Sequence, residues 1–531
     1  MARKPRDIGK GTNSLIMRKH KICLKWNDNY KEYLENVGLY GVHQIGYILS
    51  DKALVSALVE RWKPTTHTFY FPVGEMTITL EDVAMLMGLP IEGEPVCEET
   101  RANIVEDPDW PTLIRDYLGC EVDEQTFRRR SRTEIRIKWM KENFGICPEG
   151  ANQETVKYHA RAYMLMLLGS VLFTSRSGDS ISVVYLPFLI DLEAKRKYSW
   201  GSAVLACMYK ELCQACNEPT RQIAGPILLL QLWSWAHFRV GRPQVREGEP
   251  EPKLRVQEGG EEERRPVGYL WSGRHEFTKN TARNLVNYRD IMDQLRQEEV
   301  YWQPYEPHRP DVPAVCTMDE NLWMTTCPVI HLQTVETYNP GRVMRQFGKH
   351  QDFPPEPTTP IGSFGCIGRR SVRSAAQRIR EDYLDYWRRR AEFIIVEERL
   401  YDPSRYDAYI RWLQSGAQLH LQSPAQWSLG DTPVNKLQYL PTEPITRLVS
   451  NKIMEMAEKT VGKMNGELAD DDSMRAYMLD MLRGCSNVLE WIGVNIGADP
   501  TFDLLRMEQH DNQMEYQHDG EASDEASEQD E

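Results

Sequence analysis

Apolar residues recur three and four positions apart along most of this chain, and this spacing most strongly limits the folds it can adopt. In SDKALVSALVERWKP at 50–64, the side chains of Leu54, Leu58 and Trp62 fall on one helical face, and Pro64 ends the pattern. Comparable patterns follow at 154–174, 200–216, 225–240, 284–305, 448–464 and 474–493. The sequence therefore predicts a mainly α-helical, multi-helix globular domain.

A short segment near residues 66–79 departs from this pattern. THTFYF at 66–71 is rich in β-branched and aromatic residues, PVGE supplies a tight turn, and MTIT at 76–79 is a second short strand. This order predicts a small β-hairpin. Thr79 stands three residues before Asp82, which is the spacing of a helix capping box. We expect a short helix to follow and to end at Gly88.

The stretch TITLEDVAMLMGLP resembles the start of a helix-turn-helix that reads DNA. Such a motif needs a second helix directly after the turn, with polar side chains that can enter the major groove. PIEGEPVCEE follows instead, with two prolines, a glycine and four acids. Acidic side chains approach phosphate unfavourably. The sequence therefore favours a hairpin and helix that form part of a core.

Composition divides the chain into four predicted regions. The formal net charge is −14, and the last 24 residues carry ten acids and no Lys or Arg. We expect a basic, poorly ordered arm at 1–35, a helical core at 36–420 with an exposed loop at 241–267, a helical extension at 421–500, and a disordered acidic tail at 501–531.

The longest apolar stretch, AYMLMLLGSVLF at 162–173, is shorter than the roughly 18 residues that a membrane span needs. No signal peptide pattern opens the chain. The eleven cysteines show no disulfide framework, which fits a reducing compartment. We expect a soluble protein of the nucleus or, alternatively, the cytoplasm, without membrane association.

Few residues suggest chemistry. Cys213 and Cys216 form a CxxC pair that could hold half of a zinc site, with Cys207 and His237 nearby in sequence, but no second ligand pair has the required spacing. Small core residues on a helix are the simpler interpretation, and the lone His67 is more often structural. Turn and capping roles account for the carboxylates Glu75, Glu81 and Asp82. We therefore predict no catalytic residue, metal or cofactor.

The densest basic run comprises Arg128, Arg129, Arg130 and Arg132. These residues are candidates for binding a phosphate backbone or for serving as a nuclear import signal. The alternative is a solvated face of a helix.

Five blocks in order carry a family resemblance: HTFYFPVGEMTITLEDVAMLMGLPIEGEPV, WGSAVLACMYKELC, GPILLLQLWSW, YRDIMDQLRQEEVYWQPY and RVMRQFGKHQDFP. Together they resemble the plant mobile domain family, including its maintenance-of-meristems branch. The resemblance implies a nuclear protein that acts in transposable-element silencing, genome stability and meristem maintenance. It also implies a phosphatase-like plant protein as partner, and possible chromatin or nucleic-acid association.

The same family is also labelled aminotransferase-like, but no lysine here stands in a glycine- and serine-rich setting that would hold pyridoxal phosphate. The metal-binding runs of the phosphatase domain fused to some relatives are absent from the sequence. We therefore expect a non-enzymatic protein that acts through protein–protein contacts. A nucleic-acid-binding module derived from a transposon is the alternative, and an uncharacterised enzyme is a third possibility.

Overall fold

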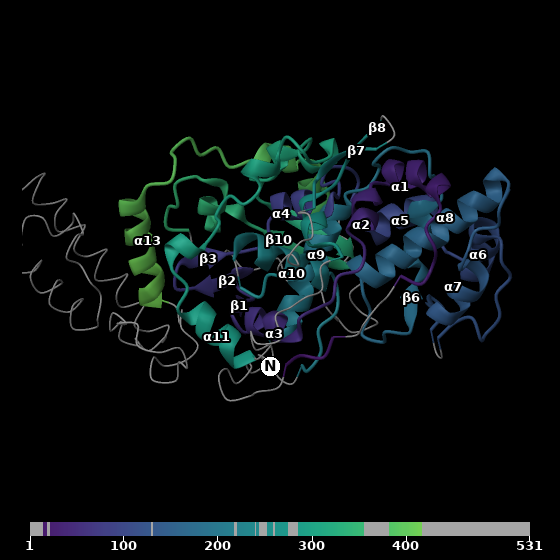
Figure 1. Ribbon diagram of the computed structural model, residues 1–531, viewed down its shortest axis with the longest axis horizontal. Helices are drawn as coiled ribbons and strands as arrows, with labels where there is room; N and C mark the ends of the chain where they lie inside the picture. Colours follow the sequence, from purple (N-terminus) through teal and green to yellow (C-terminus); the bar gives the residue numbers. More distant parts are fainter. Residues whose placement is uncertain are drawn as a thin grey trace, which may run out of the picture. The chain divides into compact units, whose positions relative to one another are not determined.

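The computed structural model describes residues 14–17, 22–128, 131–216, 220–238, 240–243, 252–258, 261–273, 285–354 and 382–416 (Figure 1). The chain divides into two compact units, residues 1–402 with 420–432, and residues 403–419 with 433–531. Of the second unit, the structure describes helix α13 (Pro403–Gly416). The predicted helical extension at 421–500 and acidic tail at 501–531 lie outside the described residues.

The first unit is mainly helical with small sheets, which confirms the predicted fold class. Its α-helices are α1 (Lys31–Val37), α2 (Tyr40–Ile45), α3 (Lys52–Glu60), α4 (Leu80–Met87), α5 (Glu98–Ile104), α6 (Trp110–Leu118), α7 (Ile137–Phe144), α8 (Gln153–Leu167), α9 (Trp200–Ala215), α10 (Ile227–His237) and α11 (Leu285–Asp293). Its strands are β1 (Trp62–Lys63), β2 (Thr68–Phe71), β3 (Gly74–Met76), β4 (Val96–Cys97), β5 (Glu134–Arg136), β6 (Ser180–Ser182), β7 (Arg255–Glu258), β8 (Glu261–Arg264), β9 (Cys327–Leu332) and β10 (Thr334–Tyr338).

Helices α4, α9 and α10 form the centre of this unit, and α4 packs against both of the others (Figure 1). Helix α10 is apolar on nearly all sides, and Trp233 and Trp235 within it are fully buried. Helix α2 crosses the end of α4 closely, because Gly41 and Gly88 carry no side chains there. A Cβ on Gly41 would stand 2.6 Å from the carbonyl oxygen of Met87. The tryptophans and glycines therefore act as packing residues of the central helices.

The predicted hairpin is present and gains a third strand. Strands β1, β2 and β3 form an antiparallel sheet in which Phe69 of β2 faces Trp62 of β1 and Met76 of β3. A second sheet has the order β10–β9–β4, and α9 packs against its strands β9 and β10. Helix α9 also contacts β1 of the first sheet, so the two sheets border the same central helix.

The segment after α4 contains no second reading helix. Residues 88–95 are non-helical, and strand β4 then pairs in parallel with β9, so that Val96 lies opposite His331. Helix α5 starts only at Glu98. The hairpin and α4 thus belong to the core, as predicted, and do not form a helix-turn-helix.

Two segments differ from the sequence expectation. In the described part of residues 1–35, Leu15 and Leu24 are buried in the core, because the apolar side chains between the basic residues pack inward. In the segment 241–267, strands β7 and β8 form an antiparallel hairpin, and Leu254 and Val267 beside it are buried. Backbone hydrogen bonds between β7 and β8 therefore give this segment regular structure, although its composition is typical of a loop. Within the described residues, no helix is both long and apolar enough to span a membrane.

Candidate functional site

The basic run predicted to bind nucleic acid or to direct nuclear import is described in the structure at Arg128 and Arg132. The backbone N–H of Ser131 donates to the carbonyl oxygen of Arg128 at 2.9 Å. Strand β5 follows from Glu134, and helix α7 begins only after that strand. Arg129 and Arg130 lie outside the described residues. The two described arginines of the run therefore do not lie on a helix.

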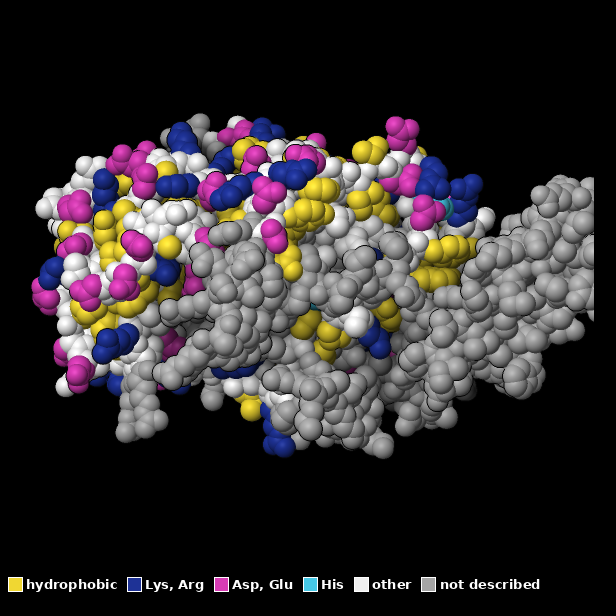
Figure 2. All heavy atoms as spheres, turned by 180° about the vertical axis from the view of Figure 1, so that it is seen from behind, with side chains coloured by type: hydrophobic (Ala, Val, Ile, Leu, Met, Phe, Trp, Pro, Cys, Tyr) yellow, Lys and Arg dark blue, Asp and Glu magenta, His cyan; other side chains and the backbone are white. Residues whose placement is uncertain are grey.

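The two described arginines of the run differ in their surroundings. Arg128 is paired, with its Nη1 3.1 Å from Oε2 of Glu134 and its Nε 3.8 Å from Oδ1 of Asp179. Arg132 is exposed, and no carboxylate in the described part of the chain forms an ion pair with it. On the coloured part of the face seen in Figure 2, which shows the described residues, basic and acidic side chains are interspersed. The role of the four arginines stays a prediction.

A buried carboxylate, that of Asp82, links the hairpin segment to the second half of the chain. The side chain of Thr79 accepts from the backbone N–H of Asp82, and Oδ2 of Asp82 accepts from the backbone N–H of Thr79 at 2.7 Å, so the predicted capping box is present. Oδ1 of Asp82 lies 2.8 Å from Nε2 of His237 and accepts from the hydroxyl of Tyr305 at 2.5 Å. Both oxygens of the carboxylate thus have polar partners within the protein, and these contacts connect three segments of the chain.

Glu75 forms a second buried link. Its carboxylate accepts from the guanidinium of Arg342 at 2.8 and 3.1 Å and from the hydroxyl of Thr68 at 2.9 Å. The side chain of Gln346 binds both the N–H and the carbonyl oxygen of Thr77. The segment RVMRQF at 342–347 is thereby bound to the hairpin through buried polar contacts.

Glu81 is the third carboxylate of this segment. Burial and the neighbouring charge of Asp82 raise the pKa of Glu81 well above its usual range, although Arg309 opposes the shift. The carboxylate of Asp82 already has four polar contacts, two with Thr79 and one each with His237 and Tyr305. The pair therefore does not offer two free carboxylates for acid–base chemistry.

The CxxC pair lies at the end of helix α9, and its sequence neighbours do not complete a metal site. Both ring nitrogens of His237 are engaged, one with Asp82 and the other with the carbonyl oxygen of Tyr301 at 2.8 Å. Cys207 is buried, and this burial raises the pKa of its thiol. These contacts therefore do not support the sequence-based hypothesis that Cys207 and His237 complete a metal site with the CxxC pair.

The structure instead brings Cys213 to two residues distant in sequence, His67 and Glu336. One possible ligand atom from each of these three residues lies within 4.8 Å of the others. Burial alone would lower the pKa of His67, but Cys213 and Glu336 raise it to about 10. The sequence contained one overlooked sign of this cluster, an acid within the strand-like segment TVETY, where Glu336 is buried.

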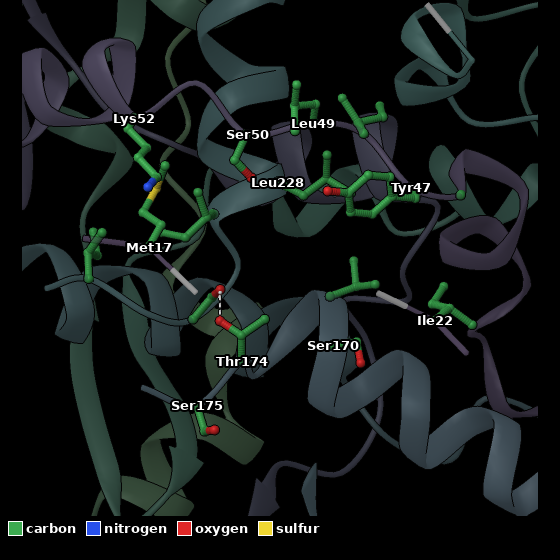
Figure 3. A pocket seen from close by; sticks show the side chains of 16 residues that line it. Met17, Ile22, Tyr47, Leu49, Ser50, Lys52, Ser170, Thr174, Ser175 and Leu228 are labelled. Atoms are coloured by element: carbon green, nitrogen blue, oxygen red, sulfur yellow. Dashed lines mark hydrogen bonds between the residues drawn. The ribbon is translucent and has the colours of Figure 1, made fainter. Parts of the chain in front are cut away.

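A separate pocket of about 70 Å³ lies between the N-terminal segment, the start of α3 and the end of the α8 region (Figure 3). Its lining includes Met17, Tyr47 and Lys52, together with Ser170 and Thr174. The hydroxyl of Thr174 donates to the carbonyl oxygen of Gly225 at 2.8 Å. The volume is well below the roughly 300 Å³ of small-molecule sites. The pocket suits a few water molecules better than a cofactor.

Comparison with known proteins shows the family. The family model for the plant mobile domain matches residues 38–414, which is most of the chain. The chain belongs to the plant mobile domain family. The matched range contains the hairpin, the central helices and the segment with Arg342 that fastens the hairpin.

Three similar proteins come from Arabidopsis thaliana. A serine/threonine-protein phosphatase 7 long form homolog is 31% identical over 85% of this chain and 32% of its own length. Protein MAIN-LIKE 1 is 33% identical over 62% of this chain and 60% of its own length. Protein MAINTENANCE OF MERISTEMS is 33% identical over 61% of this chain and 62% of its own length. The chain thus covers less than two thirds of each relative. No solved structure matches it significantly.

Proposed function

We propose that this protein is a non-enzymatic nuclear factor that acts through protein–protein contacts in transposable-element silencing, genome stability and meristem maintenance. The observation that carries the proposal is the family match over residues 38–414, together with relatives named for the maintenance of meristems. Meristem maintenance is what that relative's name states, and its extension to this chain is our inference.

The polar interior supports an interaction role over a catalytic one. Asp82 and Glu75 lie within the family's hairpin block, and both serve in buried hydrogen bonds between distant segments. A catalytic acid or base needs reach to a substrate. These two side chains are closed to solvent, so their contacts serve a rigid scaffold.

A phosphatase-like plant protein is the proposed partner. The support is the similarity to a phosphatase 7 long form homolog, which covers 32% of that protein. A chain that resembles one part of a longer protein can share the surface by which that part meets its other regions. We therefore expect this chain to bind a phosphatase-like protein in trans.

Affinity purification of the tagged full chain from nuclei, with and without nuclease, tests the proposal. Mass spectrometry should recover a phosphatase-like protein in both samples. Loss of the chain should also raise transposable-element transcripts and disturb meristem growth. A chain that stays out of nuclei, or whose partners all disappear with nuclease, would overturn the scaffold proposal.

Direct nucleic-acid binding is the second candidate, and it is favoured by Arg132, which is exposed and has no ion pair within the described part of the chain. In fluorescence anisotropy with labelled DNA, Arg132→Gln should weaken binding and reduce the salt slope by about 1. Arg115→Gln is the matched control, since Arg115 is half exposed and contacts Asp116 at 3.3 Å. Binding that is equally strong in the wild type and Arg132→Gln would reject this site.

A further inference from the structure

The cluster of His67, Cys213 and Glu336 offers three different ligand types within one buried space. His67 directly precedes β2, Cys213 lies near the end of α9, and Glu336 lies in the middle of β10. Their possible ligand atoms lie within 4.8 Å of one another. Because α9 packs against β10, the helix brings the thiol to the face of the sheet that carries the carboxylate.

The orientation of His67 is that of a metal-binding histidine. Its Nδ1 lies 3.0 Å from the carbonyl oxygen of Thr337, and a carbonyl oxygen can only accept, so Nδ1 carries the hydrogen. Its Nε2 therefore faces the cluster, 3.2 Å from Oε2 of Glu336. Histidines that bind metals commonly donate their other ring N–H to a backbone carbonyl in this way.

The backbone and the neighbouring ring hold His67 in this position. Its φ angle is +54°, in the left-handed region that costs a non-glycine residue about 1 kcal/mol or more. The ring of Trp62 lies nearly parallel to the imidazole, with the centroids 5.9 Å apart. Strain of this kind persists where the surrounding structure fixes a functional side chain.

Glu336 supplies an independent sign of a missing partner. Its side chain is 2% exposed, and Oε1 is buried without a hydrogen-bond partner among the residues that the structure describes. A buried acceptor left unsatisfied costs about 1–3 kcal/mol. The thiol of Cys213 is held in place by Trp62, whose Nε1 donates to its Sγ at 3.2 Å. A cation between them would satisfy the carboxylate and favour the thiolate form of the cysteine.

We propose that His67, Cys213 and Glu336 bind a divalent transition-metal ion, with zinc as the best match. Zinc accepts nitrogen, sulfur and carboxylate oxygen, at roughly 2.0–2.3 Å, in a tetrahedral arrangement. Metal binding displaces the protons of His67 and Cys213 into solvent. Neutral imidazole, one thiolate and one carboxylate then balance the charge of a divalent ion in this buried setting. Ligand atoms around such an ion stand about 3.4–3.8 Å apart. His67 and Glu336 are already that close, at 3.2 Å, and the three atoms together lie within 4.8 Å, so small side-chain shifts suffice for binding.

A cysteine–histidine–glutamate catalytic triad is the competing interpretation. In a triad the thiol and the carboxylate use opposite ring nitrogens of the histidine. In this protein Nδ1 of His67 is occupied by the Thr337 carbonyl, and Nε2 is the nitrogen beside the carboxylate. The geometry therefore favours metal binding over nucleophilic catalysis.

The test is titration of the purified, chelator-treated full chain with Co²⁺, followed by absorption spectroscopy, and zinc analysis of the untreated protein. Tetrahedral cobalt bound to a thiolate should give a strong charge-transfer band at about one ion per chain. Cys213→Ser should abolish the band, and Glu336→Gln should weaken Co²⁺ binding at least about tenfold. Circular dichroism reports whether each variant is folded.

Cys216→Ser is the matched control, because it makes the same change one helical turn away, at a thiol that donates to the carbonyl oxygen of Cys213 at 3.4 Å. This variant should keep the band and the affinity. A folded wild-type chain that shows no cobalt band and contains no zinc overturns the proposal. Equal loss in Cys216→Ser and Cys213→Ser overturns the assignment of these three ligands.

Discussion

Removal of one partner from the buried Glu75–Arg342 pair should destabilise the first unit strongly. The Arg342 and Glu75 side chains are 5% and 0% exposed, and Arg342 makes three contacts of 2.8–3.1 Å to the carboxylate. Arg342→Met keeps much of the aliphatic stem but leaves a buried negative charge without its cation. Such a loss costs about 3–5 kcal/mol of unfolding free energy.

The double variant separates the cost of an orphaned charge from the worth of the pair. In Glu75→Gln/Arg342→Met neither charge remains, and the amide can still accept from the hydroxyl of Thr68. We expect the double variant to lose less stability than the sum of the two single variants, with a coupling of at least about 1.5 kcal/mol. This coupling is the free energy of interaction between the Glu75 and Arg342 side chains in the folded protein.

The assay is urea denaturation of the full chain at pH 7, followed by both tryptophan fluorescence and circular dichroism. Coincident midpoints justify a two-state free energy for this transition. Arg389→Met is the matched control, because Arg389 forms an exposed pair with Glu392 at 2.7 Å, and its midpoint should stay unchanged. A loss below about 1 kcal/mol in Arg342→Met, or simple additivity in the double variant, would refute the reasoning.

Three further outcomes are expected from urea denaturation, which is repeated over a range of pH values for the first of them. Burial lowers the pKa of His331 to about 3, so the unfolded chain binds more protons between about pH 6.5 and 3, and stability should fall by up to about 1.4 kcal/mol per pH unit as the pH drops through that window. His331→Gln should flatten this slope, and an unchanged slope would contradict the assignment. Gly41→Ala places a Cβ 2.6 Å from the Met87 carbonyl oxygen and should cost about 1–3 kcal/mol, whereas an unchanged midpoint would show that α2 and α4 can separate freely. The guanidinium of Arg345 lies 4.2 and 3.9 Å from two aromatic ring centroids, so Arg345→Lys should lose about 1 kcal/mol despite keeping the charge, and full retention would argue against stacking.

Local signals in the sequence were sufficient for the hairpin, the capping box and the mainly helical class. Thr79 and Asp82 are three residues apart, so their reciprocal hydrogen bonds depend on one turn of chain and on little else. Gly88 ends α4 in the left-handed conformation for an equally local reason. The family blocks likewise stand in the sequence itself, and their resemblance was confirmed by the match over residues 38–414.

Composition predicted secondary structure less well in segments whose structure depends on pairing between strands. The charged segment that contains β7 and β8 was expected to be an exposed loop, yet the two strands pair with each other. Strand β5, which follows the basic run, likewise pairs with β6, whose residues lie more than forty positions away. A partner strand at that distance leaves no trace in the local pattern of apolar residues.

The sequence by itself therefore determined the kinds of elements and the residues at their ends, because capping and periodicity act within a few positions. Only the tertiary structure decided the partners of the buried polar groups. Asp82 meets His237 and Tyr305 across 155 and 223 positions, and His67 and Glu336 join Cys213 of the CxxC pair in the same way. Such contacts form when packing excludes water and closes long loops, and a buried polar group must then bind whatever the fold places beside it.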